Sequence, residues 1–502
     1  MHQLKRLQAL THSVSGIRHR ALNMAISAAL LGGLSMSTQA QLFPPVIDLG
    51  SLSGSDGFRL DGESDSDYAG RVSNAGDING DGIDDLIVGA PSRNDGAGSI
   101  YVVFGRDTGF DASLSLGSLN GGNGFRLDGV AAGEAAGRAI SAAGDINGDG
   151  IGDLIIGAPN SNGYAGSSYV LFGRDTSSLG TFPAIVSLAN LNGIIGFRLD
   201  GAALFDRAGR SVSGGGDING DGIDDLIIGA YGADPNGINY AGSSYVVFGR
   251  RTGFSSPINL GNLTGADGFR LDGAAVGDVS GRSLSNAGDI NGDGLDDLII
   301  GADLASPNGN TLAGSSFVVF GSDAGFAPTV ALGSLSGSDG FRLDGAAEFD
   351  FSGSSVAAAG DINGDGLDDL IVGASRASPN GNSSAGSSYV VFGRDTATTG
   401  NFPATLALSS LDGNNGFRLD GAMASDKSGV SVSAAGDING DGIDDLLIGA
   451  PSADPNGISS AGSSYVMLGR DTANIGDFAP SINLGSLNGS NGFRLDGVAE
   501  FG

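Results

Sequence analysis

The sequence predicts an all-β protein assembled from repeated four-stranded units. Three observations lead to this fold class. Apolar residues lie in short runs that end at Gly or Pro, and no run has helical spacing. The acidic segment DINGDG occurs six times, spaced by 68 to 76 residues, and begins at Asp77, Asp145, Asp217, Asp289, Asp361 and Asp437. The segment GFRLDG occurs seven times and begins at residues 57, 124, 196, 268, 340, 416 and 492.

The unit from residue 57 to about residue 123 contains four predicted strands. Apolar and polar side chains alternate in FRLD (58–61), which predicts a strand with one polar face. Residues 70–76 predict a weaker strand. DLIVGAP (85–91) and GSIYVVFG (98–105) are apolar without alternation, so we expect burial on both faces. A blade packed between the neighbouring blades of a β-propeller has this pattern. A β-solenoid is the alternative, but its coils are usually much shorter.

The acidic loop has the ligand spacing of a calcium site. With Asp77 as position 1, side-chain oxygens recur at positions 1, 3 and 5, and Gly at position 6 permits a sharp turn. Position 7 offers a backbone carbonyl, and Asp85 at position 9 closes the loop. Such hard oxygen ligands suit Ca²⁺. The loop is not an EF-hand, because position 12 is Val88 and a strand follows. The alternative is an acidic Asx-type turn without metal.

The six copies separate expected ligands from their neighbours. The second copy has Gly152 at position 8, where the others have Asp, so we expect position 8 (Asp84, for example) not to be a ligand. Carboxylates that converge in one loop repel each other unless a cation is present. We therefore predict about six Ca²⁺ ions, with these ligands: Asp77, Asn79, Asp81, Ile83, Asp85, Asp145, Asn147, Asp149, Ile151, Asp153, Asp217, Asn219, Asp221, Ile223, Asp225, Asp289, Asn291, Asp293, Leu295, Asp297, Asp361, Asn363, Asp365, Leu367, Asp369, Asp437, Asn439, Asp441, Ile443 and Asp445.

A family resemblance follows from these segments. The order GRSVS, GDINGDGIDDLIIGA, AGSSYVVFG resembles the FG-GAP repeat of the integrin α-subunit β-propeller and of related bacterial secreted proteins, over nearly all of residues 41–502. The resemblance implies a seven-bladed propeller with Ca²⁺ in the loops between the first and second strands of some blades. Integrins keep this loop in only some blades. Six loops are therefore a departure, which implies that the metal is a general structural clip here.

The seven GFRLDG segments outnumber the six acidic loops. If GFRLDG is the outer strand of each blade, six blades use the copies from 124 to 492 and the copy at 57 remains. In a closed ring, an N-terminal outer strand completes the last blade, whose inner strands come from the C-terminus. We therefore expect the given sequence to stop inside a seventh blade that lies beyond Gly502. A complete six-bladed ring with a spare strand is the alternative.

Residues 1–40 have the order of a signal peptide. Basic residues, including Lys5 and Arg6, precede a short apolar run and small residues near Ala40, where we expect cleavage. Residues 41–502 would then form a secreted or cell-surface propeller, and an N-terminal anchor is the alternative. Removing four basic residues takes the formal charge from −31 to −35, which disfavours nucleic acid as a partner. Three glycosylation sequons begin at Asn262, Asn382 and Asn488.

The composition argues against catalysis. The only histidines are His2, His12 and His19, and there is no Cys, so the common catalytic triads and dyads are impossible in residues 41–502. We expect an adhesion or protein-interaction module whose protein ligand, or alternatively glycan ligand, binds the face opposite the calcium loops. There the loops between second and third strands vary over a constant frame. A further alternative is the non-catalytic part of a larger secreted hydrolase similar to glycosylphosphatidylinositol-specific phospholipase D.

One more acid recurs in the loops that connect successive units. It lies three residues before a Gly, and we expect a structural role for it, either capping the next strand or pairing with Arg. Its six copies are Asp67, Glu134, Asp206, Asp278, Asp350 and Asp426.

Overall fold

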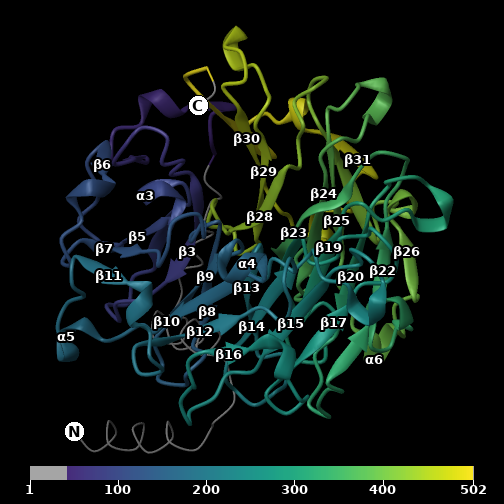
Figure 1. Ribbon diagram of the computed structural model, residues 1–502. Coiled ribbons are helices and arrows are strands. Elements are labelled where there is room, and N and C mark those ends of the chain that lie inside the picture. Colours follow the sequence, from purple (N-terminus) through teal and green to yellow (C-terminus); the bar gives the residue numbers. More distant parts are fainter. Residues whose placement is uncertain (1–41, 501–502) are drawn as a thin grey trace, which may run out of the picture. The chain divides into compact units, whose positions relative to one another are not determined.

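The computed structural model describes residues 42–500 (Figure 1), so the predicted signal peptide, residues 1–40, lies outside the described residues. Six five-stranded sheets and one two-stranded sheet make up this part of the chain, which confirms the all-β prediction. The α-helices described are single turns: α3 (Arg93–Gly96), α4 (Ser161–Tyr164), α5 (Thr176–Leu179), α6 (Thr396–Thr399) and α7 (Thr472–Ile475). They lie in connections, as expected for a chain without helical periodicity.

The first and second strands of each blade pair antiparallel, and the acidic loop joins them. The first strands are β3 (Arg71–Gly76), β8 (Ala139–Gly144), β13 (Ser211–Gly216), β18 (Ser283–Gly288), β23 (Ser352–Gly360) and β28 (Ser431–Gly436). The second strands are β4 (Asp85–Ala90), β9 (Asp153–Ala158), β14 (Asp225–Ala230), β19 (Asp297–Ala302), β24 (Asp369–Ala374) and β29 (Asp445–Ala450). A register shift marks the end of each first strand, where the chain turns into the loop.

The third and fourth strands complete the predicted antiparallel sheet. The third strands are β5 (Ser99–Val103), β10 (Ser167–Leu171), β15 (Ser243–Val247), β20 (Ser315–Val319), β25 (Ser387–Val391) and β30 (Ser463–Met467). The fourth strands carry GFRLD: β7 (Gly124–Asp128), β12 (Gly196–Asp200), β17 (Gly268–Asp272), β22 (Gly340–Asp344), β27 (Gly416–Asp420) and β32 (Gly492–Asp496). Every residue of β9 and β10 is buried, as the apolar runs without alternation predicted.

A fifth, outer strand was missed by the sequence analysis. It runs parallel to the fourth strand, and the chain of the following blade supplies it. These strands are β11 (Ile185–Ser187), β16 (Ile258–Asn259), β21 (Thr329–Ala331), β26 (Thr405–Ala407), β31 (Ser481–Asn483) and, in the sixth blade, β1 (Val46–Asp48). Two or three residues are too few for a period-2 pattern to appear, and each strand forms only because the neighbouring blade offers an edge.

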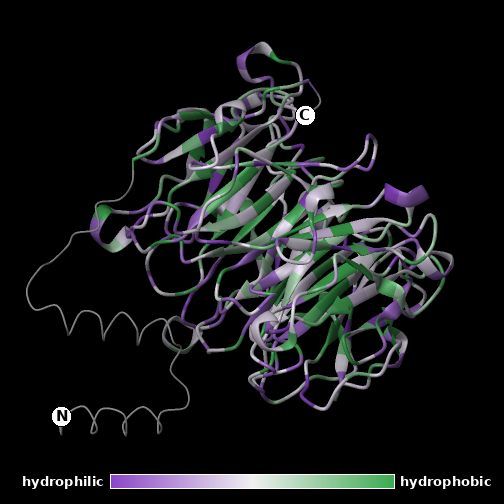
Figure 2. Ribbon diagram, turned by 90° about the vertical axis from the view of Figure 1, so that its left-hand side faces the viewer, coloured by the Kyte–Doolittle hydropathy of each residue, from purple (hydrophilic) through white to green (hydrophobic). Residues whose placement is uncertain are grey.

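The sheets pack face to face in chain order, with the first strands side by side from β3 to β28, so the fold is a β-propeller with six complete blades (Figure 1). Figure 2 shows hydrophobic residues concentrated on the strands. Glycine allows the closest approach: a Cβ atom at Gly157 of β9 would lie 2.0 Å from the carbonyl oxygen of Gly209 in the next blade. Apolar side chains of neighbouring blades, such as Ile155 and Ile228, pack into one buried cluster and join the blades.

Between residues 42 and 500 the outer edge repeats seven times, whereas six blades are complete. β2 (Arg59–Asp61) and β6 (Ser113–Ser115) pair in parallel as a separate two-stranded sheet, as fourth and fifth strands do elsewhere. A stacked Phe pair, with ring centroids 4.0–4.4 Å apart, marks each outer edge: Phe58–Phe110, Phe125–Phe182, Phe197–Phe254, Phe269–Phe326, Phe341–Phe402, Phe417–Phe478 and Phe493–Phe43. Blade 1 presents an uncovered face, since Val72 is 70% exposed whereas its counterpart Val212 is 8% exposed.

Candidate metal centre

The acidic loop is a tight turn held by its own carboxylates. In the second blade, Asp145 Oδ1 accepts the N–H of Asp149 at 2.9 Å, and its Oδ2 accepts the N–H of Gly150 at 2.8 Å. Asp149 Oδ1 accepts the N–H of Ile151 at 3.0 Å. Gly148 and Gly150 have φ of 71° and 90°, in the left-handed region that glycine adopts without strain. Hydrogen bonds thus bring positions 1, 5 and 7 of the loop next to one another, and the other copies share this sequence pattern.

The acid at position 9 is buried beneath this turn. Asp153 begins strand β9, and its side chain accepts the N–H of Ile146 at 3.1 Å and the N–H of Gly173 at 2.8 Å. It therefore ties the start of the loop to the end of the third strand. Burial, followed by the nearby charges of Asp149 and Asp145, raises the pKa of Asp153 to about 8. The same causes raise the pKa of Asp85 to about 7 and that of Asp225 to about 8.

Position 3 brings a side-chain amide to the buried carboxylate. The Nδ2 group of Asn79 lies 3.3 Å from both oxygens of Asp85. In three of the six loops the Oδ1 atom of this Asn is buried without a hydrogen-bond partner: Asn79, Asn291 and Asn363. A buried acceptor without a donor costs about 1–3 kcal/mol, so these oxygens are suited to a cation.

The predicted donors share a loop but do not form a finished cage. Within residues 42–500, no three His, Cys, Asp or Glu side chains are arranged so that they could hold a metal ion. The reason lies in the turn, where the carboxylates at positions 1 and 5 face backbone N–H groups of their own loop. The donor types nevertheless fit a hard cation, because each loop carries carboxylate oxygens and an Asn amide oxygen, which is buried without a partner in three of the six copies.

The acid at position 8 links neighbouring blades, a role that the sequence analysis did not identify. Asp224 Oδ2 in blade 3 accepts the N–H of Asp145, which is position 1 of the loop in blade 2, at 2.7 Å. Asp296, Asp368 and Asp444 make the same contact at 2.9, 2.9 and 3.1 Å. A Cβ at Gly144, the residue before the loop of blade 2, would lie 2.3 Å from Asp224 Oδ2, and its φ of 73° also favours glycine. Gly152 therefore leaves the loop of blade 1 without this bond.

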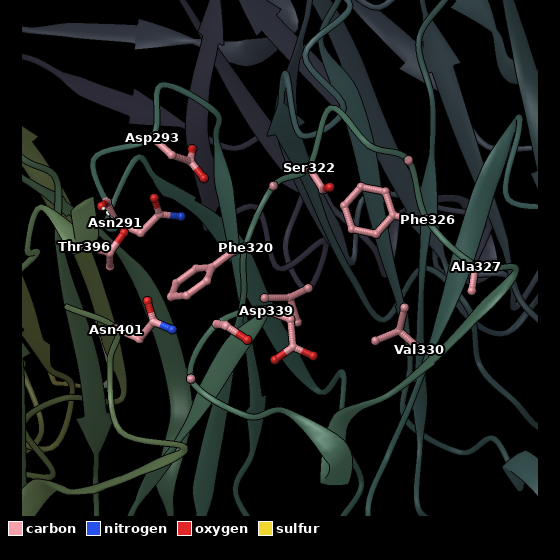
Figure 3. Close-up of a pocket in the computed structure, with 15 residues that line it drawn as sticks. Asn291, Asp293, Phe320, Ser322, Phe326, Ala327, Val330, Asp339, Thr396 and Asn401 are labelled. Carbon is pink, nitrogen blue, oxygen red and sulfur yellow. Dashed lines mark hydrogen bonds between the residues drawn. The ribbon is translucent and has the colours of Figure 1, made fainter.

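The next blade also supports the loop through its backbone. Thr176 donates both its N–H and its hydroxyl to the carbonyl oxygen of Asn79, at 2.9 and 3.1 Å, and Thr396 does the same to Asn291. Figure 3 shows Asn291 and Asp293 at one side of a pocket of about 330 Å³, with Thr396 of the following blade beside Asn291. Each loop therefore lies at a junction between two blades.

The acids in the connections between units have the structural role that we expected. Asp206, Asp278 and Asp350 each accept the backbone N–H of the residue three positions earlier, at 3.0–3.1 Å, and so close a turn. Burial raises the pKa of each of these three carboxyls to about 6. Asp67 instead lies 3.5 Å from the guanidinium of Arg93.

Comparison with known proteins agrees with this architecture. The FG-GAP repeat model matches residues 68–103, 136–171, 208–247, 280–319, 352–391 and 428–467, so each match covers the first three strands of one blade and the acidic loop. Integrin alpha pat-2 of Caenorhabditis elegans is 29% identical over 248 residues, which cover 48% of this chain and 18% of that relative. Integrin alpha-4 of Xenopus laevis is 33% identical over 185 residues, 36% of this chain and 16% of that relative.

The chain spans less than a fifth of the length of these relatives. Between residues 42 and 500 the structure contains no helix with the length and apolar character needed to cross a bilayer. The matched repeats and the integrin relatives indicate no catalytic family, in agreement with the absence of His and Cys beyond residue 40. The chain is an FG-GAP repeat protein, with a β-propeller similar to part of the integrin α subunits.

Proposed function

We propose that this protein is an exported, calcium-stabilised propeller that mediates adhesion through protein–protein interaction. The observation that supports the proposal best is the sixfold repetition of one oxygen-rich loop at the blade junctions, with a buried carboxylate in each copy. A structural clip is expected to recur in every unit, whereas a catalytic site occurs once. The integrin relatives support an interaction role for the frame that the clips hold.

Calcium would be held by positions 1, 3, 5, 7 and 9 of each loop, the thirty residues predicted from the sequence. When bound, the ion supplies positive charge to a loop that carries three carboxylates. The protein supplies the rest. Asp153 and its equivalents hold the second strand against the loop, and Asp224 and its equivalents hold the loop against the next blade. Neutralising the loop would therefore stiffen both the blade and the junction.

The partner-binding surface is proposed at the opposite end of the blades. The antiparallel register pairs Ser211 with Gly229, so the start of a first strand lies beside the end of a second strand. The loops that follow the second strands emerge at that end. They differ in length and sequence between blades: 91–98, 159–166, 231–242, 303–314, 375–386 and 451–462. Variable loops on a rigid frame are a common location for recognition. Neither the family nor the relatives support the glycan alternative.

We also propose that β2 and β6 are the outer strands of a seventh blade, whose first three strands come from polypeptide of the same repeat type. Three features support this. β2 and β6 pair like the outer strands of the other blades, and Phe58 stacks on Phe110 as in those blades. On the facing side, Ile438 of blade 6 is 37% exposed, whereas its equivalents in the other blades are fully buried. Blades 1 and 6 thus present apolar faces toward one position.

A thermal melt of the purified full chain tests the calcium proposal. We expect the melting temperature to fall strongly in excess EDTA and to recover with Ca²⁺, because each site contributes about 2.7 kcal/mol when free Ca²⁺ is 100-fold above its Kd. Native mass spectrometry should then count about six ions. The matched control is Mg²⁺ at equal ionic strength, which binds such flexible oxygen sites less well. An identical melt in EDTA and Ca²⁺ would overturn the metal role.

The interaction role needs its own measurement. Surface-bound protein is compared with a variant in which residues 231–242 are replaced by the shorter loop of residues 159–166, both with Ca²⁺. We expect the loop exchange to reduce adhesion of cells of the producing organism while the melting temperature is retained. As the matched control, Arg251→Ser changes an exposed residue at the calcium-loop end. Equal adhesion by all three proteins would refute the proposal that residues 231–242 belong to the partner-binding surface.

A further inference from the structure

Four arginines begin the first-strand segments of consecutive blades. Arg71, Arg138, Arg210 and Arg282 each follow a Gly and occupy the same repeat position. Blades 5 and 6 have Ser354 and Val430 at this position. Since those blades have the same sheet topology, the fold does not require arginine there. The cluster is therefore a property of blades 1 to 4 and not of the repeat.

The packing of the blades brings the arginines of blades 2 to 4 together at one cavity. The Gly before Arg138, Arg210 and Arg282 touches the preceding blade: a Cβ on Gly89 would lie 2.2 Å from the carbonyl oxygen of Gly137, and one on Gly229 would lie 2.1 Å from that of Gly281. Arg138, Arg210 and Arg282 therefore line one cavity of about 480 Å³. Its polar lining includes Arg138, Arg207, Arg210, Arg282, Tyr231 and Asn160.

The positive charge in this cavity is largely unbalanced. Arg282 pairs with Asp303 at 3.1 Å, a carboxylate that also attracts Arg210 at longer range, and Arg207 donates to the Asn160 side chain at 3.3 Å. In the described part of the chain, the guanidinium groups of Arg138 and Arg210 donate to no protein acceptor and form no ion pair. Burial, followed by the charges of Arg138 and Arg282, lowers the pKa of Arg210 to about 10. Burial and the charge of Arg71 lower the pKa of Arg138.

This arrangement is unusual for the molecule as a whole. The chain carries a formal charge of −31, with 56 acidic and 25 basic side chains. Gathering several of the basic residues at one cavity raises repulsion among like charges and gives no internal ion pair to Arg138 or Arg210. A site that is unfavourable to the unliganded fold, and that the fold does not require, indicates a ligand. Guanidinium forks match the geometry of carboxylates.

We propose that the arginine cluster binds a dianionic ligand that presents two carboxylates, either a free dicarboxylate or neighbouring Asp or Glu side chains at the tip of a partner's loop. The cavity volume lies within the range of small-ligand pockets and admits groups of this size. The site lies at the start of the first strands, while the calcium loops follow their ends. The proposal therefore goes beyond the calcium role and does not depend on it.

Calorimetric titration of the full chain tests this proposal, with Ca²⁺ saturating and ionic strength held constant. The probes are glutarate, as the free dicarboxylate, and tetraglutamate, as the peptide. We expect Arg210→Ser and Arg138→Ser to weaken binding at least tenfold each, because each removes a charge and a bidentate donor. The substitution follows the protein's own example at Ser354. As the matched control, Arg251→Ser removes one exposed positive charge at the opposite end and should leave the affinity unchanged.

The two probes distinguish the sources. Binding of glutarate identifies a free dicarboxylate, and binding of tetraglutamate alone identifies an acidic loop of a partner. A melt without probe shows that the variants fold, and Arg210→Ser should melt no lower than the parent because repulsion is relieved. Absence of binding by both probes, or an equal loss in Arg251→Ser, overturns the proposal. An unchanged melt in EDTA would instead refute only the calcium role.

Discussion

The two ends of the first strands differ in how strictly they repeat. At the end of each first strand, all six blades continue into the same Gly-Asp-Ile-Asn sequence and the same tight loop. At the start, the six blades carry four Arg, one Ser and one Val. The two ends of a strand such as β13 (Ser211–Gly216) are only about 17–20 Å apart, given about 3.3 Å per residue. The sequence of the repeat is thus constant at one end of the first strands and varies at the other end.

Hydrogen bonding explains the difference. At the constant end, the loop of one blade is tied to the next blade by a carboxylate and by backbone groups, for example through Asp224 and Thr176. A change there disturbs two blades at once. At the variable end, Arg138 and Arg210 form no ion pair in the described part of the chain. Changes there leave the frame intact, so that end is available for recognition.

The largest effect is expected at the buried acid of the constant end. Asp297→Ala removes the acceptor for Ile290 N–H at 3.1 Å and Gly321 N–H at 2.8 Å. Each buried N–H left unpaired costs about 1–3 kcal/mol, so blade 4 should lose roughly 2–6 kcal/mol. Amide hydrogen exchange in β19 and β20 measures this loss blade by blade. Protection equal to that of the parent would show that the acid does not hold the loop.

The matched variant Asp297→Asn separates hydrogen bonding from charge. It keeps one oxygen acceptor but removes the carboxylate. If calcium is resident in this loop, Asn should abolish the stabilisation of blade 4 by Ca²⁺. If no ion binds, Ca²⁺ should stabilise blade 4 in neither the parent nor the variant, and Asp297→Asn should cost about 1–3 kcal/mol at any Ca²⁺ concentration, because one of the two N–H groups loses its acceptor. The Ca²⁺ dependence of blade 4 therefore separates the two outcomes and tests the ligand assignment directly.

The next effect concerns the bond between blades. Asp224→Ala removes the 2.7 Å contact to Asp145 N–H and should cost about 1–3 kcal/mol, measured by denaturant unfolding. Asp84 occupies the same repeat position but is exposed, so Asp84→Ala should change stability by less than about 0.5 kcal/mol. An equal loss from both variants would show that the inter-blade bond is not the source of the effect.

A smaller effect is expected from the burial of the first strand, which differs between an enclosed blade and blade 1 at the end of the row. Val212→Ser, at a side chain that is 8% exposed, should cost about 1–2 kcal/mol, whereas Val72→Ser, at 70% exposure, should cost almost nothing. Denaturant unfolding of both variants in parallel measures the difference. A similar cost at both positions would mean that another polypeptide covers Val72 in solution. That result would support the proposed seventh blade, and a lasting difference would indicate an open position.

Local patterns predicted most of the fold. The apolar runs gave β9 and β10, and the alternation in FRLD gave the fourth strands, because both signals lie within a few residues. The fifth strand β16 and the role of Asp224 depend on contacts with another blade, which lie 59 and 79 residues away in sequence. The sequence of a single unit does not predict such contacts, because their partners lie in another unit. The arginine cluster could not be predicted from the sequence for the same reason, because Arg138 and Arg210 become neighbours only when the blades pack.

The smallest predicted effect is a pH dependence from the connection between units. Burial raises the folded-state pKa of Asp278 to about 6, so its charged form is disfavoured in the fold. Its contribution to stability is therefore unpenalised below about pH 4, falls as pH rises toward 6, and stays low above that. Asp278→Asn retains an acceptor for Ala275 N–H and cannot ionise. It should flatten this decline by about 1 kcal/mol between pH 4 and pH 7. Melts over that range measure the slope.

Asp65→Asn, an exposed acid in the equivalent connection of the first unit, is the control and should leave the slope unchanged. If Asp278→Asn kept the parent's slope, the carboxyl would be ionised without penalty, and the turn it closes would be more hydrated than the structure shows.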